Sequence, residues 1–142
     1  MTARMEVLNC MTIGLSECDK RFTSINKLIE KRKMLNNMIG LIPSLGTNKS
    51  IEDNNTRIAN LNLSKEIVAV EKMVYNAIIR SNIGLLPRLK ERYNTLVIES
   101  IEHAHEMVLQ NIISENEYLQ LANGCVEQEN YINFLCSVTT NV

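Results

Sequence analysis

The residues whose types and spacing could do chemistry are two histidines surrounded by glutamates. His103 and His105 are the only histidines of the chain, and Glu99, Glu102 and Glu106 flank them. Glu102 and His105 have the Glu-x-x-His spacing of di-iron bundles, but such a site needs this pair twice and two further carboxylates. On a helix the two histidines point about 200° apart, so they cannot readily share one metal ion. The pattern predicts a solvated acidic face, with Glu99 beside His103 at i to i+4, and no metal site.

Four cysteines are the other candidates for chemistry, and their spacing is uninformative. Cys10, Cys18, Cys125 and Cys136 form no C-x-x-C pair, and helical spacing places none of them beside a histidine. The chain has no G-x-G-x-x-G or G-x-x-x-x-G-K-[ST] sequence and no glycine-rich loop that could cradle a phosphate or an oxyanion. We therefore expect reduced, mostly buried thiols, no catalytic residues, no cofactor and no small-molecule substrate.

Charge is distributed unevenly along the chain. All fifteen Lys and Arg residues lie in residues 1–92 with nine acids, whereas residues 93–142 carry seven glutamates and no Lys or Arg. The formal net charge is only -1, so the whole molecule has no strong field, but its two parts form opposite poles. The candidate docking surface consists of Lys20, Lys27, Lys31, Arg88, Lys90 and Arg92. The candidate acidic surface consists of Glu99, Glu102, Glu106, Glu115 and Glu117.

Three of these cations occupy an unusual position. Arg88, Lys90 and Arg92 follow Pro87, which is well placed as the first residue of a helix, and the helix macrodipole disfavours cations in the first turns. We therefore expect them to face an acidic group. That group could belong to the C-terminal glutamates of the same chain, to another subunit or to a partner.

The elements that must position these side chains all have helical periodicity. Only two prolines and five glycines interrupt 142 residues, and aromatics make up 4%. Apolar residues recur at alternating spacings of three and four in the first segment, at Leu8, Met11, Leu15, Cys18, Phe22, Ile25 and Ile29. Leu28, Leu35, Ile39 and Ile42 continue this stripe with a rotation, as expected when a helix drifts off a seven-residue repeat.

We predict an all-α fold, a single-domain helical bundle with three longer helices at 3–39, 64–82 and 87–113. A capping box from Ser114 to Glu117 predicts a break, followed by a short helical hairpin at 115–138 whose first helix ends at Gly124. Residues 40–63, rich in asparagine, are predicted to be a loop-rich connection. A helix over 3–39 would be about 55 Å long, so it either breaks near Gly14 or projects and finds a partner.

The function expected from this sequence is non-enzymatic. The leading interpretation is a protein–protein interaction or assembly subunit that uses its helical faces and opposite charge poles to bind itself or a larger complex. The alternative is a nucleic-acid-associated regulatory protein that binds phosphates through the basic first helix. The sequence shows no signal peptide and no apolar run near the ~20 residues of a membrane span, so we expect no membrane partner and a reducing, cytoplasmic location. Frequent Asn and Ile, which have AT-rich codons, would suit a phage or viral origin.

Overall fold

Every regular element of the computed structural model, which describes residues 3–140, is helical. The elements are α1 (Ala3–Leu41), the 3-10 turn η1 (Pro43–Leu45), α2 (Asn48–Ile79), the 3-10 turn η2 (Ile83–Leu85), α3 (Leu86–Leu109) and α4 (Glu115–Thr140). The prediction of an all-α chain is confirmed. Residues 3–140 form four long helices instead of three, because the expected C-terminal hairpin is a single helix, and α2 is longer than predicted.

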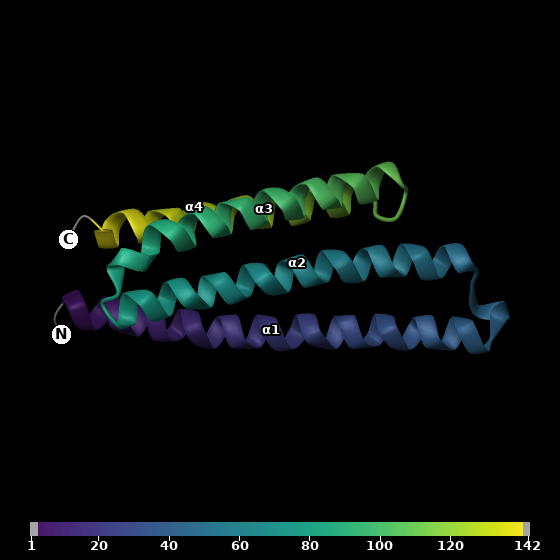
Figure 1. Ribbon diagram of the computed structural model, residues 1–142, viewed down its shortest axis with the longest axis horizontal. Helices are drawn as coiled ribbons and strands as arrows, with labels where there is room; N and C mark the ends of the chain where they lie inside the picture. Colours follow the sequence, from purple (N-terminus) through teal and green to yellow (C-terminus); the bar gives the residue numbers. More distant parts are fainter. Residues whose placement is uncertain (1–2, 141–142) are drawn as a thin grey trace.

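The helices form two antiparallel hairpins of unequal length (Figure 1). α1 and α2 make the long hairpin, and α3 and α4 make a shorter one that lies along it. Each helix packs on the next in sequence, whereas α1 and α4 form no comparable contact. The start of α1 and the end of α4 lie at one end of the molecule, and the α1–α2 turn extends beyond the α3–α4 turn at the other.

Gly14 does not interrupt α1. A Cβ atom at this position would lie 2.9 Å from Cζ of Tyr75, which is buried on α2. The glycine therefore allows α1 to approach the tyrosine ring closely. This packing offsets the cost of about 1 kcal/mol that glycine carries relative to alanine inside a helix. Since α1 is continuous, it reaches the full length that the sequence implied.

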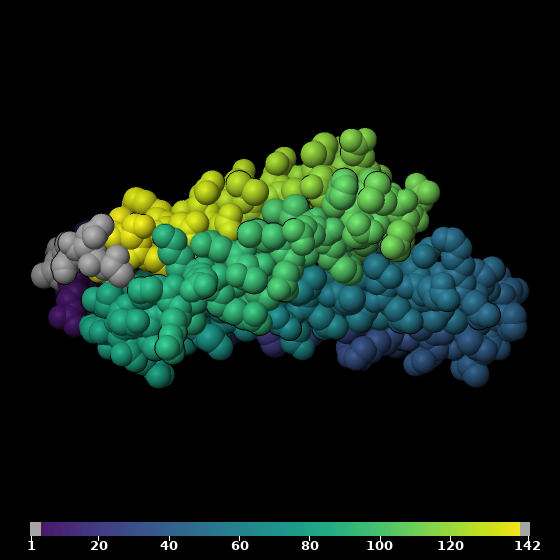
Figure 2. All heavy atoms as spheres, turned by 45° about the horizontal axis from the view of Figure 1, so that its top comes forward, coloured from purple at the N-terminus to yellow at the C-terminus, as the bar shows by residue number. Residues whose placement is uncertain are grey.

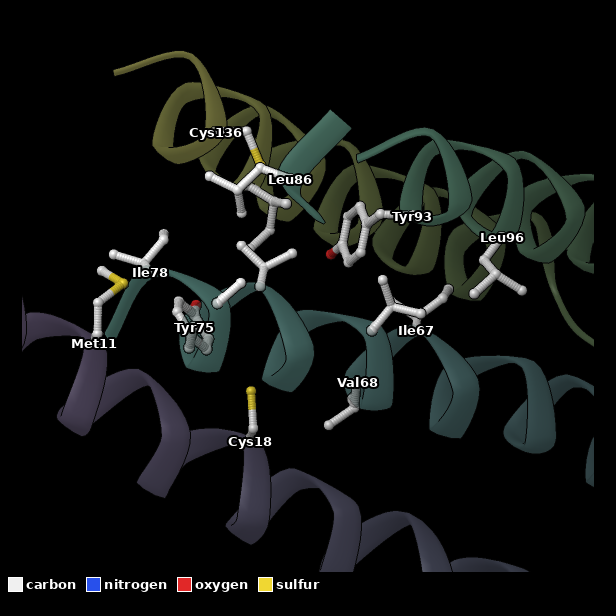
Figure 3. Packing of buried hydrophobic residues seen from close by; sticks show 14 of the residues in the cluster. Met11, Cys18, Ile67, Val68, Tyr75, Ile78, Leu86, Tyr93, Leu96 and Cys136 are labelled. Carbon is white, nitrogen blue, oxygen red and sulfur yellow. The ribbon is translucent and has the colours of Figure 1, made fainter. Parts of the chain in front are cut away.

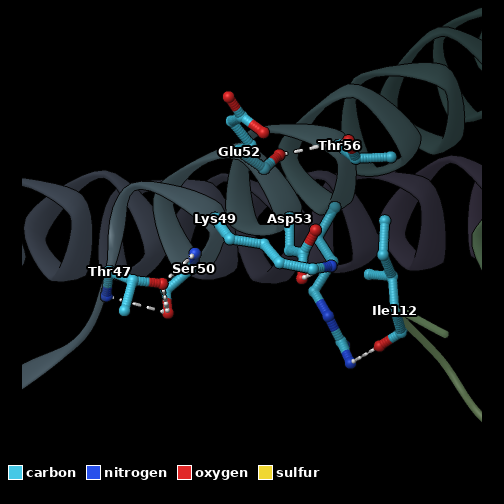
Figure 4. A network of polar contacts seen from close by, with 8 residues as sticks. Thr47, Lys49, Ser50, Glu52, Asp53, Thr56 and Ile112 are labelled. Atoms are coloured by element: carbon cyan, nitrogen blue, oxygen red, sulfur yellow. Dashed lines mark hydrogen bonds and ion pairs between the residues drawn. The ribbon is translucent and has the colours of Figure 1, made fainter. Parts of the chain in front are cut away.

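The predicted connection over residues 40–63 is wrong from residue 48 onward, because α1 ends at Leu41 and α2 already begins at Asn48. Thr47 caps it: its Oγ1 accepts a hydrogen bond from the Ser50 amide at 3.3 Å, and its own amide donates to Ser50 Oγ at 3.2 Å (Figure 4). Asparagines lower the helix propensity of this segment, but Asn54 and Asn60 are buried and bonded to other helices. These contacts override the local preference.

The break predicted at Ser114 is confirmed, although α3 ends at Leu109 instead of residue 113. Asn111 turns the chain with a φ of 58°, and Ser114 Oγ accepts a hydrogen bond from the Glu117 amide at 3.0 Å. The predicted stop at Gly124 is wrong, since α4 continues to Thr140. Tyr118 and Leu121 before this glycine pack on the small cluster at the α3–α4 turn, and Cys125 and Ile132 after it pack on the main core, so both halves of α4 are anchored.

The main core joins all four helices (Figure 3). Tyr93, Leu86 and Leu96 of α3 point from one side toward α2, and Met11 and Cys18 of α1 point toward it from the other. A smaller cluster of Ala104, Met107, Ile112 and Ile113 closes the α3–α4 turn, with Tyr118 packed against it. No helix within residues 3–140 is both long and apolar enough to cross a membrane.

Candidate interaction surface

The part of the molecule that projects from this core is the tip of the long hairpin. At the base of this tip, Arg57 of α2 contacts the α3–α4 turn, because its Nη2 donates to the Ile112 carbonyl at 2.6 Å (Figure 4). Nine residues of α2 precede Arg57, and at 1.5 Å per residue they extend about 14 Å beyond the turn. We call residues 33–56 the overhang. Figure 2 shows it as the blue end of the molecule, free of the α3–α4 pair.

The overhang exposes a concentration of large apolar side chains. Six of the nineteen exposed large hydrophobic residues in the described chain lie in it, namely Met34, Leu35, Met38, Leu41, Ile42 and Leu45. Leu41 is 83% exposed and Met34 is 63% exposed. Within the overhang only Ile39 and Asn54 are buried. Met34, Met38 and Leu41 share one face of α1 by their spacing, and monomeric proteins seldom expose large groups of apolar side chains together.

A polar layer holds the two helices of the overhang in register. The Asn54 amide nitrogen donates to the Arg32 carbonyl at 2.6 Å and to Asn36 Oδ1 at 2.8 Å, and Asn54 Oδ1 accepts from Arg32 Nη1 at 2.9 Å. Asn36 also donates to Asn55 Oδ1 at 2.8 Å. Buried polar groups of this kind specify one alignment of paired helices, because any shift would leave them unsatisfied.

A groove runs between α1 and α4 and leads toward the overhang. Its α1 wall carries Arg21, Ile25, Leu28 and Arg32, at successive spacings of four, three and four, so they share one helical face. Its α4 wall carries Glu117, Gln120, Leu121, Gly124, Cys125 and Gln128, and side chains of α2 and α3 form its floor. The groove is apolar in its middle and charged at both ends.

The buried end of this groove contains a carboxylate that the sequence analysis missed. Glu71 of α2 is completely buried, and its Oε2 accepts a hydrogen bond from Arg21 Nη1 at 2.8 Å. Its other oxygen accepts a hydrogen bond from the Gln128 amide. The sequence signal was its spacing, because Glu71 lies four residues after Ile67 and three before Val74, on the apolar face of the helix.

The electrostatics of this cluster follow from burial. Burial raises the pKa of Glu71, while the Arg21 guanidinium and the Gln128 amide oppose the shift by stabilising the carboxylate. Burial, and then the nearby Glu71 charge, raise the pKa of the Cys18 thiol to about 11. Burial also raises the pKa of Tyr93 well above its usual value. The thiol and the phenol stay protonated at neutral pH, so Cys18 is not a nucleophile there.

The predicted docking surface is divided between two regions. Arg92 lies 3.4 Å from Glu66 of α2, so its acidic neighbour is not one of the C-terminal glutamates. Lys90 lies near the C-terminal half of α4, in a hollow shared with Pro87 and Cys136. Arg88 is exposed on the same helix. These three cations lie far from the overhang, at the opposite end of α3.

The other three cations, Lys20, Lys27 and Lys31, lie on α1 before the overhang begins. Lys20 is 3.4 Å from Glu17, an exposed pair that contributes little to stability. In the described part of the chain neither Lys27 nor Lys31 forms an ion pair, and both are exposed. Both side chains therefore face solvent on the part of α1 that precedes the overhang.

The predicted acidic surface is brought together at the α3–α4 end. Glu99, Glu102 and Glu106 are exposed on α3, and Glu115 and Glu117 are exposed in the first turn of α4. Within residues 3–140, Glu117 is the member of this surface that pairs inside the chain, 3.7 Å from Arg57. The other four carboxylates are unpaired and border the space beyond the α3–α4 turn or the outer face of α3.

The two histidines point to different helices, as their spacing implied. His103 Nδ1 lies 3.2 Å from the Asn60 amide of α2, and the ring of His105 lies edge-on to Tyr118 of α4 with centroids 5.8 Å apart. His103 therefore contacts Asn60 as its hydrogen-bonding neighbour, where the sequence suggested Glu99. No cluster of three His, Cys, Asp or Glu residues suited to a metal occurs among the described residues.

Comparison of the chain with protein-family models, with curated proteins and with solved structures found no match. Its function must therefore be inferred from the geometry of the overhang, the groove and the charged surfaces.

Proposed function

We propose that this chain is a non-enzymatic protein–protein interaction or assembly subunit, a single-domain helical bundle that docks through its overhang. The observation that carries the proposal is the exposure of six large apolar side chains on a projecting two-helix element. Such a surface is unfavourable in water unless it is covered, and burying it in an interface would contribute roughly 25 cal/mol per Å² of apolar area. The unpaired lysines beside it would steer an acidic partner.

An affinity capture from the native source tests this proposal. The full chain and a Leu35→Asp variant are used as baits, and Ile13→Asp serves as a matched control because Ile13 is also exposed on α1, outside the overhang. We expect a protein that is captured by the wild type and by Ile13→Asp but is lost with Leu35→Asp. Identical captures with all three baits would mean that the overhang is not the docking element.

Nucleic-acid binding is the second candidate, and the unpaired Lys27 and Lys31 favour it. Phosphate contacts would make retention on DNA or RNA fall steeply with salt. Replacing both lysines by Gln should then abolish retention, whereas Leu35→Asp should leave it unchanged. Retention that is absent at low salt would eliminate this candidate.

A further inference from the structure

Two arginines flank the overhang at its base and line the same hollow. Arg32 is the last residue of α1 before the overhang, and Arg57 is the first residue of α2 after it. Both face a hollow of about 160 Å³ where α1 and α2 meet the α3–α4 turn. Pockets for drug-sized ligands measure about 300–1,000 Å³, so this hollow has the size for a small ion.

Each guanidinium is held in place by a neutral acceptor. Arg32 Nη1 donates to Asn54 Oδ1 at 2.9 Å, and Arg57 Nη2 donates to the Ile112 carbonyl at 2.6 Å (Figure 4). A guanidinium has more N–H donors than one acceptor uses, so both arginines keep donors for a ligand. Because amide and carbonyl oxygens carry no formal charge, these bonds orient the two cations without neutralising them.

The charges around the hollow do not balance. Among the described residues that line it, Glu117 is the one acid, and its Oε2 lies 3.7 Å from Arg57 Nη1. This distance is too long for a hydrogen bond, and the Glu117 side chain is 54% exposed, so water screens the pair. Burial and then the nearby Arg57 charge lower the pKa of Arg32, although Glu117 opposes the shift. The lining therefore holds one positive charge in excess.

We propose that Arg32 and Arg57 bind a small dianion of the phosphate class, either inorganic phosphate or a phosphate monoester. Such a group carries a charge of about −1.5 to −2 at neutral pH, and the guanidinium fork matches its oxygens. When it enters, the exposed Glu117 side chain can turn into solvent, which leaves two positive charges for the dianion to neutralise. A single carboxylate, such as Glu117 itself, leaves one of them uncompensated. The inference goes beyond the proposed function and does not depend on it.

Calorimetric titration of the full chain with inorganic phosphate, at pH 7.5 and constant ionic strength, tests the inference. We expect saturable binding of one phosphate per chain. The affinity should exceed that for acetate about tenfold, because the dianion gains at least one more charge-assisted hydrogen bond. Phosphate that does not saturate the chain, or that binds no more tightly than acetate, would overturn the inference.

Two variants separate this site from general electrostatic attraction. Arg32→Gln removes one guanidinium and should weaken phosphate binding about tenfold. Lys33→Gln is the matched control and should leave the affinity unchanged, since Lys33 adjoins Arg32 in the chain but is exposed and does not line the hollow. Equal losses in the two variants would mean that phosphate responds to net charge alone, which would contradict the assigned site.

A third variant, Glu117→Gln, keeps the test independent of folding defects because it should improve binding. It removes the acid that competes for Arg57, so phosphate should bind about threefold more tightly, whereas a folding defect would weaken binding. Since Glu117 is exposed, the variant should keep its helical circular dichroism. Unchanged or weaker phosphate binding by the folded variant would count against the inference.

Two further ligands identify the source of the phosphate. Methyl phosphate that binds as tightly as inorganic phosphate would assign the site to a monoester, and binding of inorganic phosphate alone would assign it to the free ion; both outcomes support the site. The phosphodiesters of nucleic acid carry one charge each, so a DNA oligonucleotide that competes as strongly per phosphate as methyl phosphate would refute the preference for a dianion. Leu35→Asp should bind phosphate like the wild type, so this inference and the proposed function fail separately.

Discussion

Replacing Arg21 by Met should destabilise the protein far more than replacing its partner Glu71 by Gln, and the difference should depend on pH. The pair is asymmetric. Glu71 is completely buried, whereas the Arg21 side chain is 43% exposed and reaches the groove between α1 and α4. Loss of the carboxylate leaves a guanidinium that water can solvate, but loss of the guanidinium leaves a buried carboxylate with the Gln128 amide as its donor.

The expected magnitudes follow from that asymmetry. Stranding a buried charge costs about 3–5 kcal/mol, so Arg21→Met should lower the free energy of unfolding by this amount at pH 7. Glu71→Gln keeps the volume and a hydrogen-bond acceptor for Arg21, and should cost about 1 kcal/mol. The double variant Arg21→Met/Glu71→Leu removes both charges and should recover most of the loss, because well-packed apolar residues often replace a buried ion pair without penalty.

The pH dependence has a defined sign. Burial already raises the pKa of Glu71 above its value in the unfolded chain, and removal of Arg21 raises it further. Between the unfolded and the folded pKa the native state holds a proton that the unfolded state has lost, so the stability of Arg21→Met must fall as pH rises through this window. Its deficit relative to the wild type should be smallest near the pKa of an unfolded glutamate and largest above the raised pKa of the folded variant.

Urea denaturation followed by circular dichroism, repeated across this pH range, measures all three variants. The linear dependence on denaturant gives the free energy of unfolding at each pH. Equal costs for Arg21→Met and Glu71→Gln, or a cost for Arg21→Met that does not change with pH, would refute the reasoning that Glu71 is buried and ionised through its contact with Arg21.

Three further outcomes are expected. Gly14→Ala should cost about 1–3 kcal/mol in denaturation because its methyl group meets a buried tyrosine ring, whereas Gly124→Ala, whose Cβ has no neighbour within 4 Å, should raise stability by up to about 1 kcal/mol; the reverse order would contradict the packing. Asn54→Ala should accelerate hydrogen exchange in the overhang without shifting the global midpoint, and a cooperative loss of about 1–3 kcal/mol would show that the overhang is part of the core. A thiol reagent at pH 8 should modify the exposed Cys10 in the native protein and reach Cys18 only after unfolding, and equal rates would contradict its burial.

Local signals in the sequence predicted the fold where the deciding contacts are also local. The three-and-four spacing of apolar residues predicted α1 because a continuous stripe requires one helix. The capping box at Ser114 predicted the break because both of its partners lie within three residues. The hydrogen bond from Arg57 to the Ile112 carbonyl at the α3–α4 turn joins residues far apart in the sequence, and no local pattern predicted it.

The errors occurred where distant residues decide the structure. Asn54 is satisfied by Arg32 and Asn36, which lie 22 and 18 positions earlier, so its segment looked like a loop when considered alone. Gly124 was expected to end a helix, but apolar residues before it pack on the small cluster and those after it pack on the main core, so both sides are held by distant contacts. The acidic residues of the candidate surface lie along the second half of α3 and in the first turn of α4, while the cations lie on two helices, α1 and α3.

The overhang links the stability of this molecule to its proposed function. Since Ile39 and Asn54 are its buried residues, the overhang gains little free energy from its own packing and remains helical mainly because α1 and α2 continue into the bundle. Covering its apolar side chains would therefore stabilise the overhang much more than the rest of the chain. If the overhang docks, amides of residues 33–56 should be protected from hydrogen exchange while amides of the core change little. That result would identify the overhang as the element that a partner orders.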